Sequence, residues 1–543
     1  MANVVEHNLN EILRDSHKPA LILPYRNAET KKADPIYLFN TELVEIIDKL
    51  TQEKPIKDLK PNDRIVFLFP NSVEYVAVFF AILKVNATAC PLNPNYTVDE
   101  LDFYLNDLLP KAVIIPKGES PASREACNKL GIPLYEIETK FVEKANVGKI
   151  PMLTSLPVEL ENKTLASWIA ENKPYESKKN IALFLHTSGT TGRPKGVPLT
   201  HHNIFVTLKN IKDSYELSPK DTYLLVMPLF HVHGLIGVLL TTLYAGGSVI
   251  IPPKFSATTF WMDFIEFEAT CYSAVPTIHQ ILLLKKEEDF PGKDKISKLR
   301  FIRSCSSSLA PATLKELEET FNAPVIEAYA MSEAAHQMTC NFLPPGVRKA
   351  GSVGKGRGVA VVIMDDNGKI VDNGTIGEVC IAGENVITEY YNNPTATANS
   401  FFDDPTGTLP NGLKWFRTGD LGYKDPEDFI FLTGRIKEQI NRGGEKISPI
   451  EIDQYILQLG NVAEVCTFGV KSEIYGQEIE CAVVAKDDTL TEQQLTEHCK
   501  AKLAAFKVPK RFWIVKEIPK TATGKVQRRV VSQHFEELAA KSQ

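Results

Sequence analysis

Three segments of the sequence repeat one pattern of apolar runs, and this repetition limits the folds that are open to the chain. In each segment a short apolar run, a longer amphipathic run and a second short run follow one another. Short apolar runs are typical of buried strands, and longer amphipathic runs are typical of helices. The pattern therefore predicts strand–helix–strand units of a parallel sheet, at residues 64–69, 73–83 and 87–92, at 223–226, 235–244 and 248–251, and at 301–304, 313–321 and 325–329.

The length of the chain requires more than one domain. It has 543 residues, whereas single hydrophobic cores stop growing at roughly 250–300 residues. After residue 346 the pattern changes to shorter strands with turn residues, such as Asp366-Asn367-Gly368, which is typical of a hairpin. A stretch rich in charge and glycine follows Thr433. We therefore expect an α/β protein with a large N-terminal domain of layered sheets (1–433), a β-rich subdomain within it (about 346–433) and a compact α+β C-terminal domain.

The net charge, the cysteines and the two ends of the sequence indicate which partners and which cellular location to expect. The net charge of -6 gives no reason to expect nucleic acid, and the nine scattered cysteines are typical of reduced thiols. The N-terminal segment lacks the pattern of a secretory signal, so we expect a cytoplasmic protein, monomeric or homodimeric. The C-terminal residues Ala-Lys-Ser-Gln are not the peroxisomal Ser-Lys-Leu signal, although peroxisomal import stays an alternative.

One uncharged stretch, residues 222–253, is long enough to cross a membrane. Pro228, His231, His233 and the pair Gly246-Gly247 interrupt it. Strand-length apolar runs also flank a shorter helical one. The sequence favours a buried β-α-β unit, and no integral membrane association is expected.

The segment at residues 187–196 is the strongest candidate for ligand binding. It follows an apolar strand at 181–186 and reads Thr-Ser-Gly-Thr-Thr-Gly-Arg-Pro-Lys-Gly. Its glycines allow amide groups to point inward, while hydroxyls and Lys195 add donors and charge. It is not a Walker A loop, because Gly196 follows Lys195 where Ser or Thr would be needed. A surface turn is the alternative, but ligands bind at the carboxyl ends of parallel strands, which favours a phosphate site.

The loop resembles the phosphate-binding signature of the adenylate-forming superfamily, which includes acyl-CoA synthetases, 4-coumarate–CoA ligases, firefly luciferase and peptide-synthetase adenylation domains. Four further family motifs follow in order, at residues 329–333, 415–420, 434–438 and 519–525. The resemblance covers about residues 30–535. It implies an ATP-dependent, AMP-forming ligase that converts a carboxylic acid, ATP and CoA into acyl-CoA, AMP and diphosphate through an acyl-adenylate, without a tightly bound organic cofactor.

The resemblance also assigns roles to residues. Lys525 would stabilise the charge that develops between the carboxylate and the α-phosphate, and Asp420 would accept both ribose hydroxyls. Residues 434–437 would form a hinge that makes the C-terminal domain (438–543) mobile. The implied sets are catalytic residues Lys525, Glu333, His231 and Lys437; magnesium ligands Glu333 and Thr190; CoA-binding residues Arg442, Gly443 and Gly444; and nucleotide-binding residues Thr187, Ser188, Gly189, Thr190, Thr191, Gly192, Lys195, Ser307, Ala328, Tyr329, Ser332, Asp420 and Arg435.

The acid is less constrained by the motifs. Carried over from 4-coumarate–CoA ligases, the acyl pocket would contain His231, His233, Ser306 and His336. Such polar groups suit a small acid with a second polar group better than an alkyl chain, because leaving them unpaired costs roughly 1–3 kcal/mol each. Longer stretches around these residues resemble the oxalate–CoA ligases of fungi and plants, so oxalate is expected. A medium- or long-chain fatty acid, 4-coumarate, a carrier-protein-loading enzyme and an inactive nucleotide-binding scaffold are the alternatives.

Overall fold

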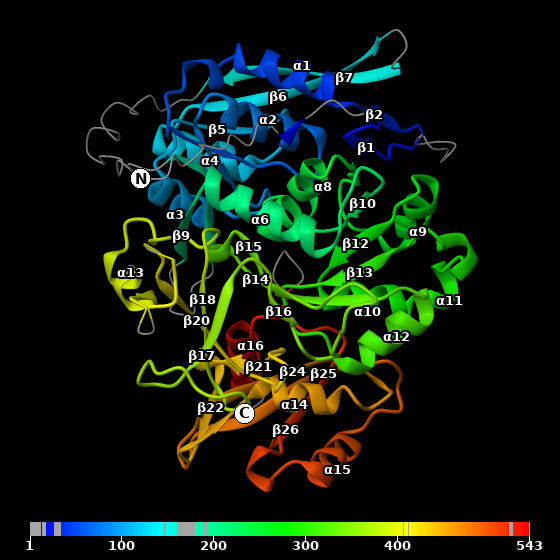
Figure 1. The fold of residues 1–543 in the computed structure, drawn as a ribbon, viewed down its shortest axis with the longest axis vertical. Coiled ribbons are helices and arrows are strands. Elements are labelled where there is room, and N and C mark those ends of the chain that lie inside the picture. Colours follow the sequence, from blue (N-terminus) through cyan, green and yellow to red (C-terminus); the bar gives the residue numbers. More distant parts are fainter. Residues whose placement is uncertain are drawn as a thin grey trace.

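The computed structural model describes residues 12–13, 18–26, 34–144, 148–159, 180–187, 194–404, 407–410, 412–520 and 525–541. Two large sheets occupy the upper part of the molecule in Figure 1, and the C-terminal elements, coloured orange to red, form its lower end. This arrangement leaves the two sheets and the C-terminal elements facing one another across the site described below.

The first large sheet has seven strands in the order β7-β6-β5-β3-β4-β8-β9. Its inner strands pair in parallel, whereas β7 and β9 at the two edges pair antiparallel. The strands are β3 (Arg64–Phe67), β4 (Thr88–Pro91), β5 (Ala112–Pro116), β6 (Leu134–Lys144), β7 (Gly148–Val158), β8 (Ile181–Thr187) and β9 (Lys195–Thr200).

The second large sheet has nine strands in the order β16-β15-β14-β13-β12-β10-β11-β1-β2. Strands β1 and β10 to β14 pair in parallel, and both edges are antiparallel. The strands are β1 (Leu21–Leu23), β2 (Ile36–Leu38), β10 (Thr222–Leu225), β11 (Ser248–Ile250), β12 (Cys271–Ala274), β13 (Phe301–Ser304), β14 (Val325–Met331), β15 (His336–Cys340) and β16 (Lys355–Gly356).

Helices cover both faces of these sheets. Successive strand residues point to opposite faces: Ile65 and Phe67 face the core between the sheets, while Val66 faces the outer core. Helices α2 (Val73–Lys84), α6 (His201–Ser214) and η3 (Leu235–Leu240) fill the layer between the sheets. Helices α3 (Val98–Leu108) and α4 (Pro121–Leu130) cover the seven-stranded sheet, and α9 (Ala257–Glu266), α10 (Pro276–Leu284) and α12 (Pro311–Phe321) cover the nine-stranded sheet.

Helix α1 (Asn40–Thr51) packs against α2. The remaining helical segments of the layered part are short: η2 (Ile56–Asp58), α7 (Val232–Gly234), α8 (Thr241–Tyr244), α11 (Lys286–Asp289), η4 (Lys293–Ile296) and η5 (Ser332–Ala334). In the described part of the chain no helix is both long and apolar enough to cross a membrane.

A five-stranded sheet follows the layered sheets and carries the β-rich pattern. The predicted turn forms there, with the Gly368 N–H donating to the Asp365 carbonyl at 3.0 Å. The elements are β17 (Ala360–Met364), β18 (Gly377–Ala382), α13 (Pro394–Ser400), β19 (Phe401–Phe402), β20 (Trp415–Lys424) and β21 (Ile430–Arg435).

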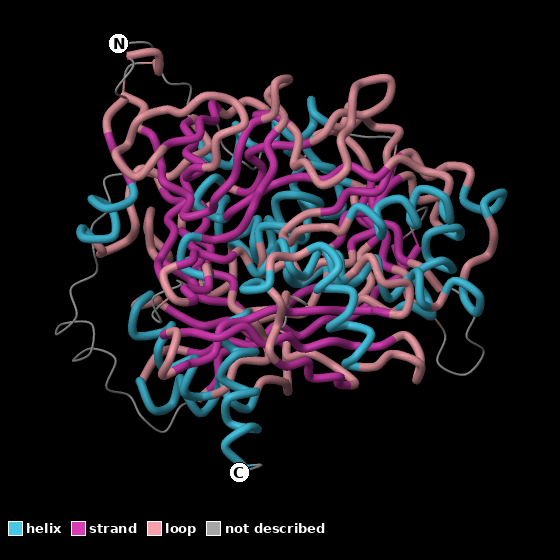
Figure 2. Tube along the Cα trace, turned by 90° about the horizontal axis from the view of Figure 1, so that it is seen from below, coloured by secondary structure: helices cyan, strands magenta, loops and turns pink. Residues whose placement is uncertain are grey.

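The C-terminal elements form another five-stranded sheet with cores of their own. In Figure 2 the last helix projects from the body of the molecule, with the C-terminus at its tip. The elements are η6 (Ile436–Glu438), β22 (Ile440–Arg442), β23 (Glu445–Ile447), α14 (Pro449–Ile456), β24 (Val462–Ser472), β25 (Gly476–Ala485), α15 (Glu492–Lys502), η7 (Ala505–Lys507), β26 (Arg511–Val515) and α16 (Arg528–Lys541).

The α/β prediction is confirmed, and the uncharged stretch is the buried unit β10–helix–β11, whose strands pair in parallel. The helix expected at 235–244 differs in detail, because its centre is the π-helical η3. The Thr241 hydroxyl donates to the Ile236 carbonyl at 2.6 Å, and such side-chain bonds compete with the regular helical ladder.

Candidate active site

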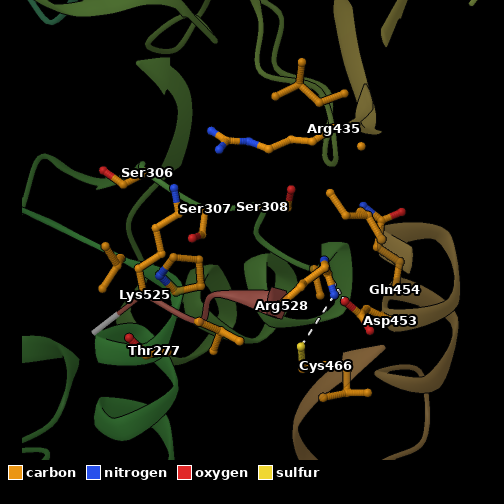
Figure 3. A pocket seen from close by; sticks show the side chains of 18 of the residues that line it. Thr277, Ser306, Ser307, Ser308, Arg435, Asp453, Gln454, Cys466, Lys525 and Arg528 are labelled. Atoms are coloured by element: carbon orange, nitrogen blue, oxygen red, sulfur yellow. Dashed lines mark hydrogen bonds and ion pairs between the residues drawn. The ribbon is translucent and has the colours of Figure 1, made fainter. Parts of the chain in front are cut away.

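A cavity of about 260 Å³ lies between the carboxyl ends of β13 and β14 and the C-terminal elements. This is the edge of a parallel sheet at which ligands usually bind. Figure 3 shows its polar side chains converging from both sides. The sheet side contributes Ser306, Ser307, Ser308, Ala328, Tyr329 and Ala330, and the C-terminal side contributes Ile450, Asp453, Gln454, Cys466, Lys525 and Arg528.

Asp420 forms one wall of this cavity and is held by two neighbours. It lies opposite Arg435 in the β20–β21 register, and Arg435 Nε is 3.0 Å from its Oδ1. The Tyr329 hydroxyl donates to Oδ2 of the same carboxylate. Asp420 raises the pKa of Arg435, so this guanidinium stays charged. The result is a fixed, 6% exposed carboxylate whose oxygens can accept hydrogen bonds from a ligand in the cavity.

Lys525 enters the cavity from the residues that precede α16. Its side chain points toward Ser306 and Ser307 in Figure 3. Burial, and then the charge of Arg435, lower the pKa of Lys525, while Asp420 and Glu438 oppose that change. His231 is close enough that burial, followed by the charge of Lys525, lowers its pKa to about 4. His231 is therefore neutral at pH 7.

Glu333 lies in a group with Tyr390 and with Lys195, the first residue of β9. The Tyr390 hydroxyl donates to Glu333 Oε1 at 2.8 Å, and Lys195 Nζ lies 4.3 Å from the centre of the Tyr390 ring. Burial raises the pKa of Glu333, and Tyr390 and Lys195 act in the opposite direction.

A magnesium ion fits this group. The described residues contain no cluster of three or more metal-binding side chains. Mg²⁺, however, usually keeps several waters and binds through one or two carboxylates together with substrate phosphates. Glu333 is a buried carboxylate of this kind, with Lys195 close by.

The loop itself falls mostly outside the described residues. This applies to the predicted residues Ser188, Gly189, Thr190, Thr191 and Gly192. Its two ends are described: Thr187 ends β8 and pairs antiparallel with Lys195 at the start of β9. The loop therefore joins two hydrogen-bonded strands. Ser332, also predicted to bind nucleotide, lies in η5 next to Glu333.

The four residues predicted to bind the acid form one cluster. His233 is fully buried; its Nδ1 lies 3.1 Å from Ser306 Oγ and its Nε2 lies 2.6 Å from Ser273 Oγ. The backbone N–H of His233 donates to His231 Nδ1 at 3.2 Å. The His336 ring stacks on that of His233 at 5.4 Å. Ser306 is on the cavity wall, and the histidines are not among the lining residues.

The predicted CoA-binding residues lie away from this cavity. Arg442, Gly443 and Gly444 form the end of the β22–β23 hairpin. Arg442 Nη2 donates to Glu478 Oε2 at 3.1 Å, and its guanidinium lies 4.1 Å from the centre of the Tyr475 ring. Lys437, predicted to be catalytic, is exposed in η6. Burial lowers the pKa of Lys195, Glu333 acts in the opposite direction, and the charge of Lys437 adds to the lowering.

Sequence reasoning missed several residues of the site. Tyr390 bonds to Glu333 across 57 residues of chain, and Ser273 bonds to His233 across 40, so no local pattern announces either contact. Arg303 could have been found, because a charged residue within the buried strand Phe301–Ser304 is unusual unless it is paired.

A layered α/β fold in which a buried carboxylate and a lysine from a smaller C-terminal part meet at one cavity is typical of nucleotide-binding enzymes. Residues 56–391 match the family model of AMP-binding enzymes, and residues 451–525 match that of the AMP-binding enzyme C-terminal domain. The chain belongs to the AMP-binding enzyme family.

Named relatives and a solved structure resemble almost the whole chain. It is 46% identical to an oxalate–CoA ligase of Arabidopsis thaliana over 88% of this chain and 89% of that protein. It is 44% identical to an oxalate–CoA ligase of Saccharomyces cerevisiae over 87% of each. The ATP-bound structure of MatB from Rhodopseudomonas palustris matches with a TM-score of 0.81 and 28% identity, over 98% of this chain and 99% of that one.

Proposed function

We propose that the chain is an ATP-dependent, AMP-forming acid–CoA ligase whose acid is oxalate. It would convert oxalate, ATP and CoA into oxalyl-CoA, AMP and diphosphate through an oxalyl-adenylate. The resemblance to oxalate–CoA ligases of a plant and a yeast supports this substrate.

The observation that carries the choice of acid is the polarity of the buried cluster around His233. Both its ring nitrogens face serine hydroxyls, and neither nitrogen of His336 has a hydrogen-bond partner among the described residues. Buried polar groups left without partners cost roughly 1–3 kcal/mol each, and an alkyl chain would offer them none. Ser306 is the member of this cluster that lines the cavity, and its hydroxyl could donate to a second carboxylate on the acid.

In the first half-reaction one oxalate oxygen attacks the α-phosphorus of ATP, a P–O bond forms and diphosphate leaves. Two anions must approach each other, so fixed positive charge near the reacting atoms lowers the barrier. Lys525 and Arg435 would supply that charge, Asp420 would hold the ribose, and Lys195 would face the leaving diphosphate. A magnesium ion bound by Glu333 and Thr190 would neutralise phosphate charge.

In the second half-reaction the CoA sulfur attacks the oxalyl carbonyl carbon, the thiol proton is released and the C–O bond to AMP breaks. We propose that the C-terminal domain rotates about residues 434–437 between the two steps and brings Arg442, Gly443 and Gly444 to the adenylate. The position of Lys525 beside Ser306 and Ser307 supports an arrangement that serves the first half-reaction. Gly434 has φ +151°, a conformation that suits glycine at a flexible joint.

The deciding experiment is an AMP-release assay with ATP, Mg²⁺ and CoA across oxalate, malonate, acetate, hexanoate and 4-coumarate. We expect turnover with oxalate to exceed that with every other acid. Turnover with hexanoate or 4-coumarate but none with oxalate would contradict the substrate and leave the reaction class intact. Replacing CoA by a carrier protein tests the carrier-loading alternative, and no AMP release with any acid would favour an inactive scaffold.

Location and assembly stay predictions. Fluorescence microscopy of the tagged chain would distinguish cytoplasm from peroxisome, and sedimentation velocity would distinguish monomer from homodimer.

A further inference from the structure

Arg303 carries a positive charge into the core of the nine-stranded sheet. It is fully buried on β13, and no carboxylate lies within ion-pair distance of it among the described residues. Its guanidinium instead faces neutral acceptors: the Tyr215 hydroxyl at 2.9 Å, Ser273 Oγ at 3.3 Å and Gln337 Oε1 at 3.2 Å. Buried charges are usually paired with an opposite charge, so this exception points to a role for the cation.

A guanidinium can only donate hydrogen bonds, and this fixes the direction of the bonds next to it. Ser273 Oγ accepts from Arg303 Nη1, so its own hydrogen is left for His233 Nε2, which lies 2.6 Å away. No other acceptor for the Ser273 hydroxyl is recorded within the described ranges. If His233 Nε2 carried the proton, Ser273 Oγ could accept from it as well, but the Ser273 hydrogen would then lack an acceptor. The arrangement that satisfies both groups has His233 Nε2 as the acceptor.

The direction continues through the imidazole to the cavity. A neutral His233 that accepts at Nε2 must carry its proton on Nδ1, and Nδ1 lies 3.1 Å from Ser306 Oγ. Burial, followed by the charge of Arg303, lowers the pKa of His233 well below its usual range, which keeps the ring neutral. With that tautomer Ser306 Oγ accepts from Nδ1–H, and its own hydrogen can point into the cavity that Ser306 lines.

We propose that Arg303 and Ser273 are positioning residues that, through His233, turn the Ser306 hydroxyl into a hydrogen-bond donor for the distal carboxylate of the acid. This inference rests on the proposed function and names the group that recognises the second carboxylate. An ionised carboxylate only accepts hydrogen bonds. A hydroxyl whose hydrogen already points toward it therefore binds it more tightly than a hydroxyl whose hydrogen is free to rotate. The chain of donors also passes the influence of a buried cation to a substrate that Arg303 does not touch.

Ser273→Ala tests the chain at its smallest link. We expect the KM for oxalate to rise about tenfold or more, because hydrogen bonds to charged groups are among the stronger ones, with a smaller change in kcat and in the KM for ATP. Turnover of acetate, which lacks a distal carboxylate, should change little. Ser248→Ala, which removes another buried serine hydroxyl from the same sheet, is the matched control and should leave all these constants unchanged.

Coupling separates a relay from independent contributions. If the effect of Ser273 passes through Ser306, the double variant Ser273→Ala/Ser306→Ala should raise the oxalate KM no further than Ser306→Ala alone. Effects that add in the double variant, or a loss of equal size with oxalate and acetate, would overturn the proposal in favour of a structural role for Ser273.

A spectroscopic measurement tests the same chain without substrate. In ¹⁵N-histidine-labelled protein, with His233 assigned through His233→Gln, we expect the Nδ1–H tautomer in the wild type and a shift toward the Nε2–H tautomer in Ser273→Ala. An Nε2–H tautomer in the wild type would overturn the relay. Because this readout uses no acid, its outcome is independent of whether oxalate is the substrate, which the wild-type assay decides.

Discussion

Two polar residues that are predicted to bind the acid have backbone conformations that residues with side chains rarely adopt. Ser306 has φ +74° and His336 has φ +103°. Non-glycine residues in this region cost of order 1–3 kcal/mol and persist only where their surroundings hold them, which happens often at functional sites. The packing of His336 shows how: a Cβ on Gly237 would lie 2.4 Å from His336 Nε2, so only glycine lets η3 approach the ring this closely.

Lys525→Ala should reduce adenylate formation by a factor of about 10²–10³, the usual effect of losing one fixed transition-state donor. ATP binding should be little changed, because Asp420 and the phosphate loop remain. Oxalate-dependent ATP–diphosphate exchange measures the rate of adenylate formation, and an equilibrium binding experiment measures the affinity for ATP. Lys516→Ala, at an exposed position in the same part of the chain, is the control, and exchange at the wild-type rate in Lys525→Ala would remove Lys525 from the mechanism.

At this scale several residues that the family resemblance assigns to nucleotide binding lie together on one cavity, and their role stays a prediction. Ser307, Ala328, Tyr329, Asp420, Arg435 and Lys525 all line it. The supporting residues escaped prediction because their partners are distant in sequence: Tyr215 meets Arg303 across 88 residues. A motif records which residue stands at a position, but the hydrogen bonds that orient it depend on the tertiary fold.

Among the elements, η3 shows where periodicity stops being informative. Its six residues, Leu235–Leu240, are all buried, so no polar face marks the helical period. The sequence predicted a helix here, and a helical segment exists. An entirely apolar segment can form α, π or 3₁₀ turns, so its composition does not distinguish among them. The sequence signal for an irregular helix here was the pair Thr241 and Thr242, whose hydroxyls donate to carbonyls of the preceding turn.

Gly354 joins the edge of the nine-stranded sheet to β21, because its carbonyl accepts from Ile430 N–H at 2.9 Å. It has φ +78°, and a Cβ there would lie 2.0 Å from the Cys340 carbonyl atoms. Gly354→Ala should destabilise the protein by about 3 kcal/mol or more, since backbone strain and a collision with main chain combine. A lowered midpoint of thermal unfolding measures this.

Gly374→Ala is the matched control for that variant. Gly374 has φ +90° and nothing within 4 Å of its Cβ position, so only the backbone strain of about 1–2 kcal/mol applies. Equal losses in the two variants would show that the collision at Gly354 is relieved by movement of the neighbouring strand.

For the whole molecule, the sequence predicted the α/β class but could not predict the order of the strands. Strand β1 pairs with β11, placing Leu21 opposite Val249, and no local pattern encodes a pairing across such a distance. The prediction of layers succeeded because apolar runs report burial on both faces. The order of strands depends on which edges remain free once the layers have packed.

Buried histidines should make stability depend on pH. Burial lowers the pKa of His279 to about 3 and those of His201 and His231 to about 4, below the value of about 6.5 expected in the unfolded chain. The unfolded chain then binds more protons in this window, so stability is complete above about pH 6.5 and falls as the pH drops toward 4, by up to about 1.4 kcal/mol per pH unit for each group.

The thermal midpoint measured between pH 7 and pH 4 tests this dependence. His279→Gln should flatten the decline, while Leu284→Ala, at an exposed position on the same helix, should keep its slope. An unchanged slope in His279→Gln would mean that His279 does not contribute to the acid sensitivity.

The opposed pair Asp420 and Arg435 would give the proposed nucleotide a second effect. Asp420 belongs to the β20 strand, and Arg435 ends β21 immediately before the connection to the C-terminal elements. A ligand that engages Asp420 would alter its balance with Arg435 and so change the free-energy difference between positions of the C-terminal part. If the C-terminal part rotates as proposed, linkage makes the effect reciprocal: a position that separates Arg435 from Asp420 would change the affinity for the nucleotide by the same factor.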